Sequence, residues 1–171
     1  MISLKRWFVN SVLAVLPPTR CFDFKRFLWK RIGISVGHRT KINSGASVWG
    51  VGSMSVGDAC WLGMNLTVIV PHGAHVTIGS SVDIGPDVMI ECGSHEIGGP
   101  DRRAGKGQAT DVAIGSGTWV GARAMLLGGA KLGPGTIVGA GAVVLRGDYP
   151  ENAVLVGVPA RVDRILDANG E

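Results

Sequence analysis

The 171-residue chain is poor in aromatic residues, in cysteine and in long apolar runs, and each shortage excludes something. Aromatic residues make up 6% of the chain, so its core must consist mainly of aliphatic side chains. Cys21, Cys60 and Cys92 have no zinc-ligand spacing and form no Cys-x-x-Cys motif, so we expect buried thiols in a reducing compartment. The apolar run from Val12 to Leu16 is too short to span a bilayer. No small-residue cleavage site follows it, so we expect no secretory signal peptide.

Glycine is abundant instead, with 27 of the 171 residues, and an apolar residue recurs at every sixth position of the C-terminal part, with Pro150 as the one exception. The series is Ile114, Val120, Leu126, Leu132, Val138, Val144, Pro150, Val156 and Val162. A helix repeats every 3.6 residues and a strand every two, so a period of six indicates neither of them alone. It predicts an all-β fold, a parallel β-helix of hexapeptide repeats, in which three faces close a coil of about 18 residues and about six coils stack.

The repeats divide the chain into three predicted parts: a helical N-terminal segment (1–33), a β-helix domain (34–166) and a C-terminal tail (167–171). Inside the domain the six-residue register meets Glu, Arg and Gln at positions 96, 102 and 108. Such side chains cannot fill an apolar core unpaired, so residues 92–111 are predicted to leave the wall as an extruded loop. Long polar loops on a rigid scaffold tend to carry function.

The N-terminal segment is basic and aromatic. Nine Lys and Arg residues lie among the first 41 residues, and only Asp23 opposes them. We expect a short helix over residues 2–16, ended by Pro17-Pro18, and a segment that caps the open end of the β-helix, lies at a membrane interface, or does both. No nucleic-acid-binding motif accompanies the charge, so an anionic membrane surface or a phosphorylated ligand is the better partner. The expected location is cytoplasmic, at the inner face of a membrane.

Four stretches resemble the hexapeptide-repeat acyltransferases, and more narrowly the group of maltose and galactoside acetyltransferases. They are the loop with His95, Thr118–Ala122, Val138–Val144 and Val156–Val162, within a similarity that covers about residues 34–166. The resemblance implies a left-handed β-helix, a handedness that spacing cannot supply and that opposes the usual crossover preference. It also implies a homotrimer whose cleft is completed by a neighbour, acetyl-CoA as co-substrate, a hydroxyl-bearing saccharide as acceptor, and no metal.

His95 is the candidate catalytic base for direct acetyl transfer without an acyl-enzyme. Transfer to a hydroxyl needs a base that works near neutral pH, and histidine supplies one. In some relatives an acidic residue orients this histidine, and Glu96 is the candidate here, with Asp87 and Glu91 as alternatives.

The resemblance also implies which residues bind coenzyme A and the acceptor. For coenzyme A these are Trp119, Ala122, Ala140, Arg146, Arg161 and Arg164. The N–H of Ala122 is the candidate oxyanion donor, and Arg161 and Arg164 suit nucleotide phosphates. Leu145 departs from the pattern, because several relatives have a hydroxyl residue there. The acceptor candidates are Asn65, Arg102 and Arg103.

Three other functions remain open at this point. A carbonic anhydrase of the γ class shares the β-helix and binds zinc through three histidines, which His72, His75 and His95 would supply, although their spacing does not fit. A serine acetyltransferase-like enzyme has a similar tail but normally a large helical N-terminal domain, which 33 residues cannot supply. A non-catalytic β-helix would bind a partner through its flat faces.

Overall fold

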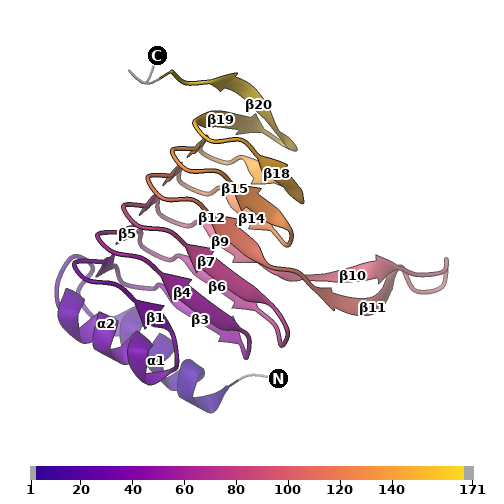
Figure 1. The fold of residues 1–171 in the computed structure, drawn as a ribbon. Helices are drawn as coiled ribbons and strands as arrows, with labels where there is room; N and C mark the ends of the chain where they lie inside the picture. The colour runs from indigo at the N-terminus through magenta and orange to yellow at the C-terminus, as the bar shows by residue number, and fades with distance from the viewer. Residues whose placement is uncertain (1–2, 168–171) are drawn as a thin grey trace.

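The computed structural model describes residues 3–167, and in it the chain winds into a stack of coils with two helices at one end and a long hairpin at one side (Figure 1). The helices are α1 (Leu4–Val15) and α2 (Phe22–Arg31). Each full coil contributes one short strand to each of three sheets, so neighbours in a sheet are parallel and come from successive coils, up to the antiparallel pair at the C-terminal end of one sheet. This confirms the predicted left-handed parallel β-helix of about six coils.

The strands fall into three columns, one for each face of the prism. The first sheet consists of β1 (Ser35–Val36), β4 (Ser53–Val56), β7 (His75–Ile78), β12 (Val112–Ile114), β15 (Ala130–Leu132) and β18 (Gly147–Tyr149). The second consists of β2 (Lys41–Ile42), β5 (Trp61–Leu62), β8 (Asp83–Ile84), β13 (Trp119–Val120), β16 (Ile137–Val138), β19 (Ala153–Gly157) and β20 (Ala160–Ile165). The third consists of β3 (Ser47–Gly50), β6 (Thr67–Val70), β9 (Met89–Glu91), β14 (Met125–Leu127) and β17 (Val143–Val144).

The core is a set of vertical stacks of aliphatic side chains, one stack for each sheet. In the third sheet Val68 pairs with Ile90, and Ile90 with Leu126, and all three are fully buried. Small buried residues fill the corners, among them Thr118, Ala124, Ala130, Thr136 and Ala142. Each buried Val, Ile or Leu contributes about 1.5–3 kcal/mol, but only because the next coil covers it. Stability therefore comes from stacking, and no coil is self-sufficient.

The six-residue register does not run unbroken to Val162, and that prediction was wrong. Leu132 stacks on Tyr149 and Val138 on Leu155, which are one position earlier than the predicted Pro150 and Val156. Val156 and Val162 are 44% and 43% exposed. The physical reason is a turn after Val144 that is one residue shorter than in the preceding coil, because Leu126 pairs with Val144 but Ala130 pairs with Gly147. The shift makes Leu155 the inward residue and turns Val156 outward, and Val162 lies on β20, which folds back antiparallel on β19.

The predicted extruded loop is confirmed, and it is an ordered β-hairpin. β10 (Gly93–Ile97) and β11 (Ala104–Ala109) pair antiparallel and project from the corner between the third and first sheets (Figure 1). The Thr110 N–H donates to the Cys92 carbonyl at 2.9 Å and closes the base of the hairpin. The three polar positions that break the register, 96, 102 and 108, are all exposed.

The two helices cover the first coil. The inner side of α1 holds it there through polar groups, since Arg6 donates to the carbonyls of Gly50 and Gly52, and Asn10 bonds both backbone groups of Val48. In residues 3–167 neither helix is long and apolar enough to cross a membrane. The domain boundaries at residues 33 and 166 stay predictions, and residues 168–171 of the predicted tail lie outside the described part of the chain.

Candidate functional site

His95 lies on β10, and its ring is held by the opposite strand of the hairpin. Its Nδ1 is 3.0 Å from the carbonyl oxygen of Gly105. A carbonyl oxygen only accepts hydrogen bonds, so Nδ1 must carry the proton, and the neutral ring keeps its lone pair on Nε2. The side chain is exposed, so this lone pair is open to solvent and to a ligand. The hairpin thus presents a base in one defined tautomer.

A groove of about 710 Å³ runs along this side of the hairpin base. It is lined by Pro71, His72, Glu91, Gly93, Ser94, His95, Gly107, Gln108 and Ala109. Glu91 Oε1 accepts a hydrogen bond of 2.6 Å from the Gly93 N–H, which ties this carboxylate to the first residue of β10. Of the three carboxylates considered for His95, Glu91 is the one that shares its groove.

Glu96 and Asp87 are placed elsewhere. Glu96 follows His95 on the same strand, so its side chain points to the opposite face of the hairpin. Within residues 3–167 the Glu96 side chain makes no hydrogen bond or ion pair, whereas the Gly105 carbonyl bonds the His95 ring, and an orienting role for Glu96 stays a prediction. Asp87 accepts from Asn65 Nδ2 at 3.0 Å and lies 3.9 Å from Arg123, at the corner between the second and third sheets.

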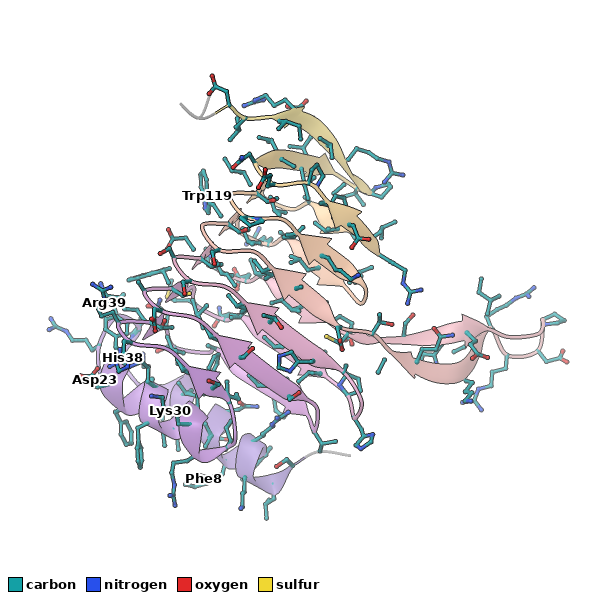
Figure 2. The ribbon with its side chains drawn as sticks, in the orientation of Figure 1. Phe8, Asp23, Lys30, His38, Arg39 and Trp119 are labelled. Atoms are coloured by element: carbon teal, nitrogen blue, oxygen red, sulfur yellow. The ribbon has the colours of Figure 1, made fainter. Side chains whose placement is uncertain are left out.

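A second groove, of about 440 Å³ and largely apolar, lies along the second sheet and that same corner. It is lined by Gly85, Pro86, Trp119, Gly121, Ala122, Ile137, Val138, Gly139 and Ala140. Trp119 is 58% exposed and projects from the edge of the coils (Figure 2). Among residues 3–167, the N–H groups of Ala122 and Ala140 donate to no other group. The groove therefore offers an aromatic face and two free backbone donors.

Arg164 lies on the second sheet, in the same row of register partners as Trp119. The register runs from Trp119 to Ile137, from Ile137 to Val154, and from Val154 to Arg164, so the two residues are three strands, roughly 14 Å, apart. Arg164 pairs with Asp163 at 2.8 Å, while Arg161 bonds the carbonyl of Ala160 at 3.0 Å. Both arginines are exposed on β20, above the second groove.

The remaining predicted residues divide between the two corners. Arg146 donates to Thr110 Oγ1 at 3.0 Å, so it lies at the base of the hairpin and not with Trp119. Arg102 and Arg103 lie at the hairpin tip, where Arg103 reaches the Gly98 carbonyl at 3.4 Å. Asn65 lies beside Asp87, on the corner of Ala122. In one chain the third sheet separates His95 from Trp119 and Ala122, so the predicted site is split into two halves.

Comparison with known proteins agrees with these repeats. The family model "Bacterial transferase hexapeptide (six repeats)" matches residues 111–146. The chain is a hexapeptide-repeat protein. It is 43% identical over 99 residues to Nodulation protein L of Rhizobium meliloti and 31% identical over 115 residues to galactoside O-acetyltransferase of Escherichia coli. These matches cover 58% and 67% of this chain, but the chain spans only about half of each relative, 54% and 55%.

Solved structures show the same fold at low identity. A hexapeptide-repeat acetyltransferase of Vibrio cholerae, solved with acetyl coenzyme A, superposes with a TM-score of 0.74 at 22% identity over 95% of this chain and 86% of its own. A maltose O-acetyltransferase of Clostridium difficile superposes with a TM-score of 0.64 at 22% identity over 95% of this chain and 87% of its own. At this identity the likeness establishes the architecture of the hexapeptide-repeat protein and nothing finer.

Sequence reasoning missed a third groove, of about 1050 Å³, at the helical end of the second sheet. Trp61 lies in register with Lys41 on one side and Asp83 on the other, and Asp83 lies in register with Trp119. Lys41 Nζ is 5.7 Å from the Trp61 ring, which also packs at 6.1 Å against Phe22. The signal was present, because each of these four ladder residues immediately precedes an inward apolar residue and must point outward.

The buried cysteines of the hexapeptide-repeat protein are poor nucleophiles. Burial, together with the charges of Glu91 and Asp111, raises the pKa of the Cys92 thiol to about 12. Burial also raises the pKa of Cys60. Cys92 therefore stays a neutral thiol beside the hairpin base, which disfavours an acyl-cysteine intermediate. Cys21 is exposed, so the expectation of three buried thiols was wrong for that residue.

No metal site is evident in the described part of the chain, where no three His, Cys, Asp or Glu side chains form a group that could hold an ion. Of the three histidines considered for zinc, His75 bonds Ser53 Oγ through Nδ1 at 2.6 Å and Ser55 Oγ through Nε2 at 3.1 Å. His95 is held by Gly105 on the hairpin. Both rings are thus engaged with protein groups on different elements.

Proposed function

We propose that this hexapeptide-repeat protein is an acetyl-CoA-dependent O-acetyltransferase that acts on a hydroxyl group of a saccharide. The single observation that carries the proposal is the hydrogen bond from His95 Nδ1 to the Gly105 carbonyl, because it leaves Nε2 free as a base at an open groove. The naming of relatives as galactoside O-acetyltransferases supports the same reaction.

The reaction is a direct transfer. Nε2 of His95 takes the proton of the acceptor hydroxyl as the oxygen attacks the thioester carbonyl of acetyl-CoA. The free N–H of Ala122 donates to the oxyanion that forms on the carbonyl oxygen. When the carbon–sulfur bond breaks, the protonated ring returns its proton to the thiolate, and the products are the acetyl ester and coenzyme A.

This mechanism needs two chains. The third sheet keeps His95 and Ala122 of one chain apart, whereas the hairpin extends sideways, away from its own coils (Figure 1). A hairpin that reaches the second sheet of a neighbour would bring the two halves together. Such a head-to-tail contact closes into a ring if each chain repeats it. We therefore propose a homotrimer, with one complete site at each interface.

Coenzyme A would be held along the second sheet. Trp119 and the free N–H groups of Ala122 and Ala140 suit the pantetheine amides, and Arg161 and Arg164 suit the nucleotide phosphates above them. Arg146, beside the hairpin base, remains a candidate for the same ligand from the adjoining corner.

The acceptor would approach from the helical end, through the third groove. Trp61 offers a flat ring on which a sugar can stack, and Asp83 and Lys41 offer hydrogen bonds on either side of it. Asn65, Arg102 and Arg103 are further candidate contacts. The cations suit an acidic or phosphate-bearing sugar, so we propose an envelope or capsule polysaccharide, or its precursor, modified at the inner face of a membrane.

The test is thiol release from acetyl-CoA against a panel of sugars, oligosaccharides, antibiotics and serine. We expect the highest activity on a saccharide, and a loss of about 10²–10⁴-fold in kcat for His95→Ala. His75→Ala is the matched control, because that ring is bonded to Ser53 and Ser55 and does not line the groove of His95.

Three other outcomes would contradict parts of this proposal. Full activity in His95→Ala would overturn the mechanism. Serine as the best acceptor would indicate a serine acetyltransferase-like enzyme. Absence of any coenzyme A binding would indicate a non-catalytic scaffold.

A further inference from the structure

The two N-terminal helices carry an apolar surface that faces away from the coils. The buried residues of α1, Arg6, Val9, Asn10 and Leu13, are spaced at helical intervals and face the first coil. The opposite side of α1 carries Leu4, Trp7, Phe8 and Val15, which are 78%, 51%, 60% and 83% exposed. The cap needs only one side of the helix, so capping does not explain these side chains.

α2 continues the same surface. Phe24 and Phe27 are 47% and 54% exposed, and their rings stack with centroids 6.4 Å apart. A groove of about 570 Å³ joins the helices, and it is lined by Leu4, Lys5, Trp7, Phe8, Val9, Phe27, Leu28, Arg31 and Ile32. Figure 2 shows Phe8 projecting from the helical end of the molecule. We call the surface made by Leu4, Trp7, Phe8, Val15, Phe24 and Phe27 the outer helical face.

Basic side chains border this face. Lys5, Lys30 and Arg31 are exposed and form no ion pair within residues 3–167. The only acidic residue of either helix, Asp23, is paired with Arg26. Exposed Trp and Phe beside unpaired Lys and Arg, on helices too short to span, is the composition of a segment that lies in a lipid headgroup region.

We propose that the outer helical face docks the protein on an anionic phospholipid bilayer, with the aromatic rings at the headgroup boundary and the lysines and arginine at lipid phosphates. The outer helical face shares only Phe24 with the third groove, and its other residues line none of the three grooves on the second sheet and hairpin, so Trp7 tests the contact apart from the acetyl-transfer chemistry. In the proposed homotrimer the parallel coils would place three such faces at one end, which raises the effective affinity for a flat surface.

The experiment is sedimentation of the full chain with vesicles of phosphatidylcholine, with or without phosphatidylglycerol. We expect binding to the vesicles that contain phosphatidylglycerol, at least about tenfold weaker binding without it, and weakening as salt is raised. Trp7→Ser should lower the affinity for the vesicles about tenfold, since it removes one aromatic ring that enters the headgroup boundary when the protein binds. Trp119→Ser is the matched control, because Trp119 is similarly exposed at 58% but lies on the fourth coil.

A second pair of variants tests the charge. Lys30→Glu with Arg31→Glu should weaken binding about tenfold or more. Lys131→Glu, an exposed lysine paired with Asp148 far from the helices, should not. Thermal unfolding verifies that each variant is folded, and thiol release on a soluble acceptor without vesicles separates this proposal from the enzymatic one.

Three results would overturn the proposal. One is wild-type protein that stays in solution with both kinds of vesicle. Another is wild-type binding by Trp7→Ser and by the double charge variant. The last is a wild-type protein that binds no vesicles, together with a Trp7→Ser variant that forms a smaller oligomer than the wild type. That result would assign the outer helical face to a second copy of the chain.

Discussion

The two corners that carry the candidate chemistry are built in opposite ways. Between the third and first sheets the chain leaves the wall, and the hairpin presents a side chain, His95. Between the second and third sheets the chain stays in the wall, and tight turns present backbone N–H groups at Ala122 and Ala140. Side-chain chemistry thus arises where the repeat breaks, and backbone chemistry where it holds. The first depends on one interrupted coil, whereas the second follows from the repeat itself.

Removal of one backbone donor tests the corner between the second and third sheets directly, and we expect a larger effect there than from the substitutions that follow. Ala122 occupies the same register position as Pro86 one coil earlier, because Val120 pairs with Ile84. Ala122→Pro therefore deletes the N–H in a turn that already accepts proline in this chain. We expect kcat to fall about 10²–10³-fold, the usual cost of losing one oxyanion donor, with little change in thermal unfolding.

Ala140→Pro is the matched control, since Ala140 is the next position in the same column. It should raise the KM for acetyl-CoA and leave kcat less affected. Chains carrying His95→Ala and chains carrying Ala122→Pro, unfolded and refolded together, should regain activity, because some interfaces then combine two intact halves. If the mixture stays inactive, both halves belong to one chain and the trimeric cleft is wrong.

The contrast between the corners also explains how much the sequence could predict. The period of six predicts the coils and their inward residues up to Val144, and its polar failures at 96, 102 and 108 locate the hairpin. It fails from Tyr149 onward, because the turn after Val144 is one residue shorter and shifts the inward positions by one. The partner of His95 is a backbone carbonyl, which leaves no residue signal. His95 and Ala122 are separated because their turns lie at different corners of the coil. The corner of each turn follows from the strand pairing of the whole chain, and the sequence alone does not give it.

Substitution of a buried residue and of an exposed residue of the same six-residue series should lower the free energy of unfolding by different amounts. Leu126 is fully buried between Ile90 and Val144, whereas Val156 is 44% exposed on β19. Leu126→Ala should lower the free energy of unfolding by about 2–5 kcal/mol. Val156→Ala should lower it by less than about 1 kcal/mol, since little of its surface leaves water. Guanidinium unfolding at one protein concentration measures both. Equal losses would mean that the apolar register does continue to Val156.

The smallest effect is expected at the end of the wall, where β20 places two arginines above the Trp119 groove. Arg161→Ala and Arg164→Ala should each raise the KM for acetyl-CoA about tenfold, because each loses one charge-assisted contact to a phosphate. Neither should change kcat, since β20 lies roughly 14 Å from Trp119. Acetyl-pantetheine is the matched control substrate, because it lacks the nucleotide phosphates, and with it both variants should equal the wild type. A loss that persists with acetyl-pantetheine would assign the arginines to the fold of the β19–β20 hairpin and not to the ligand.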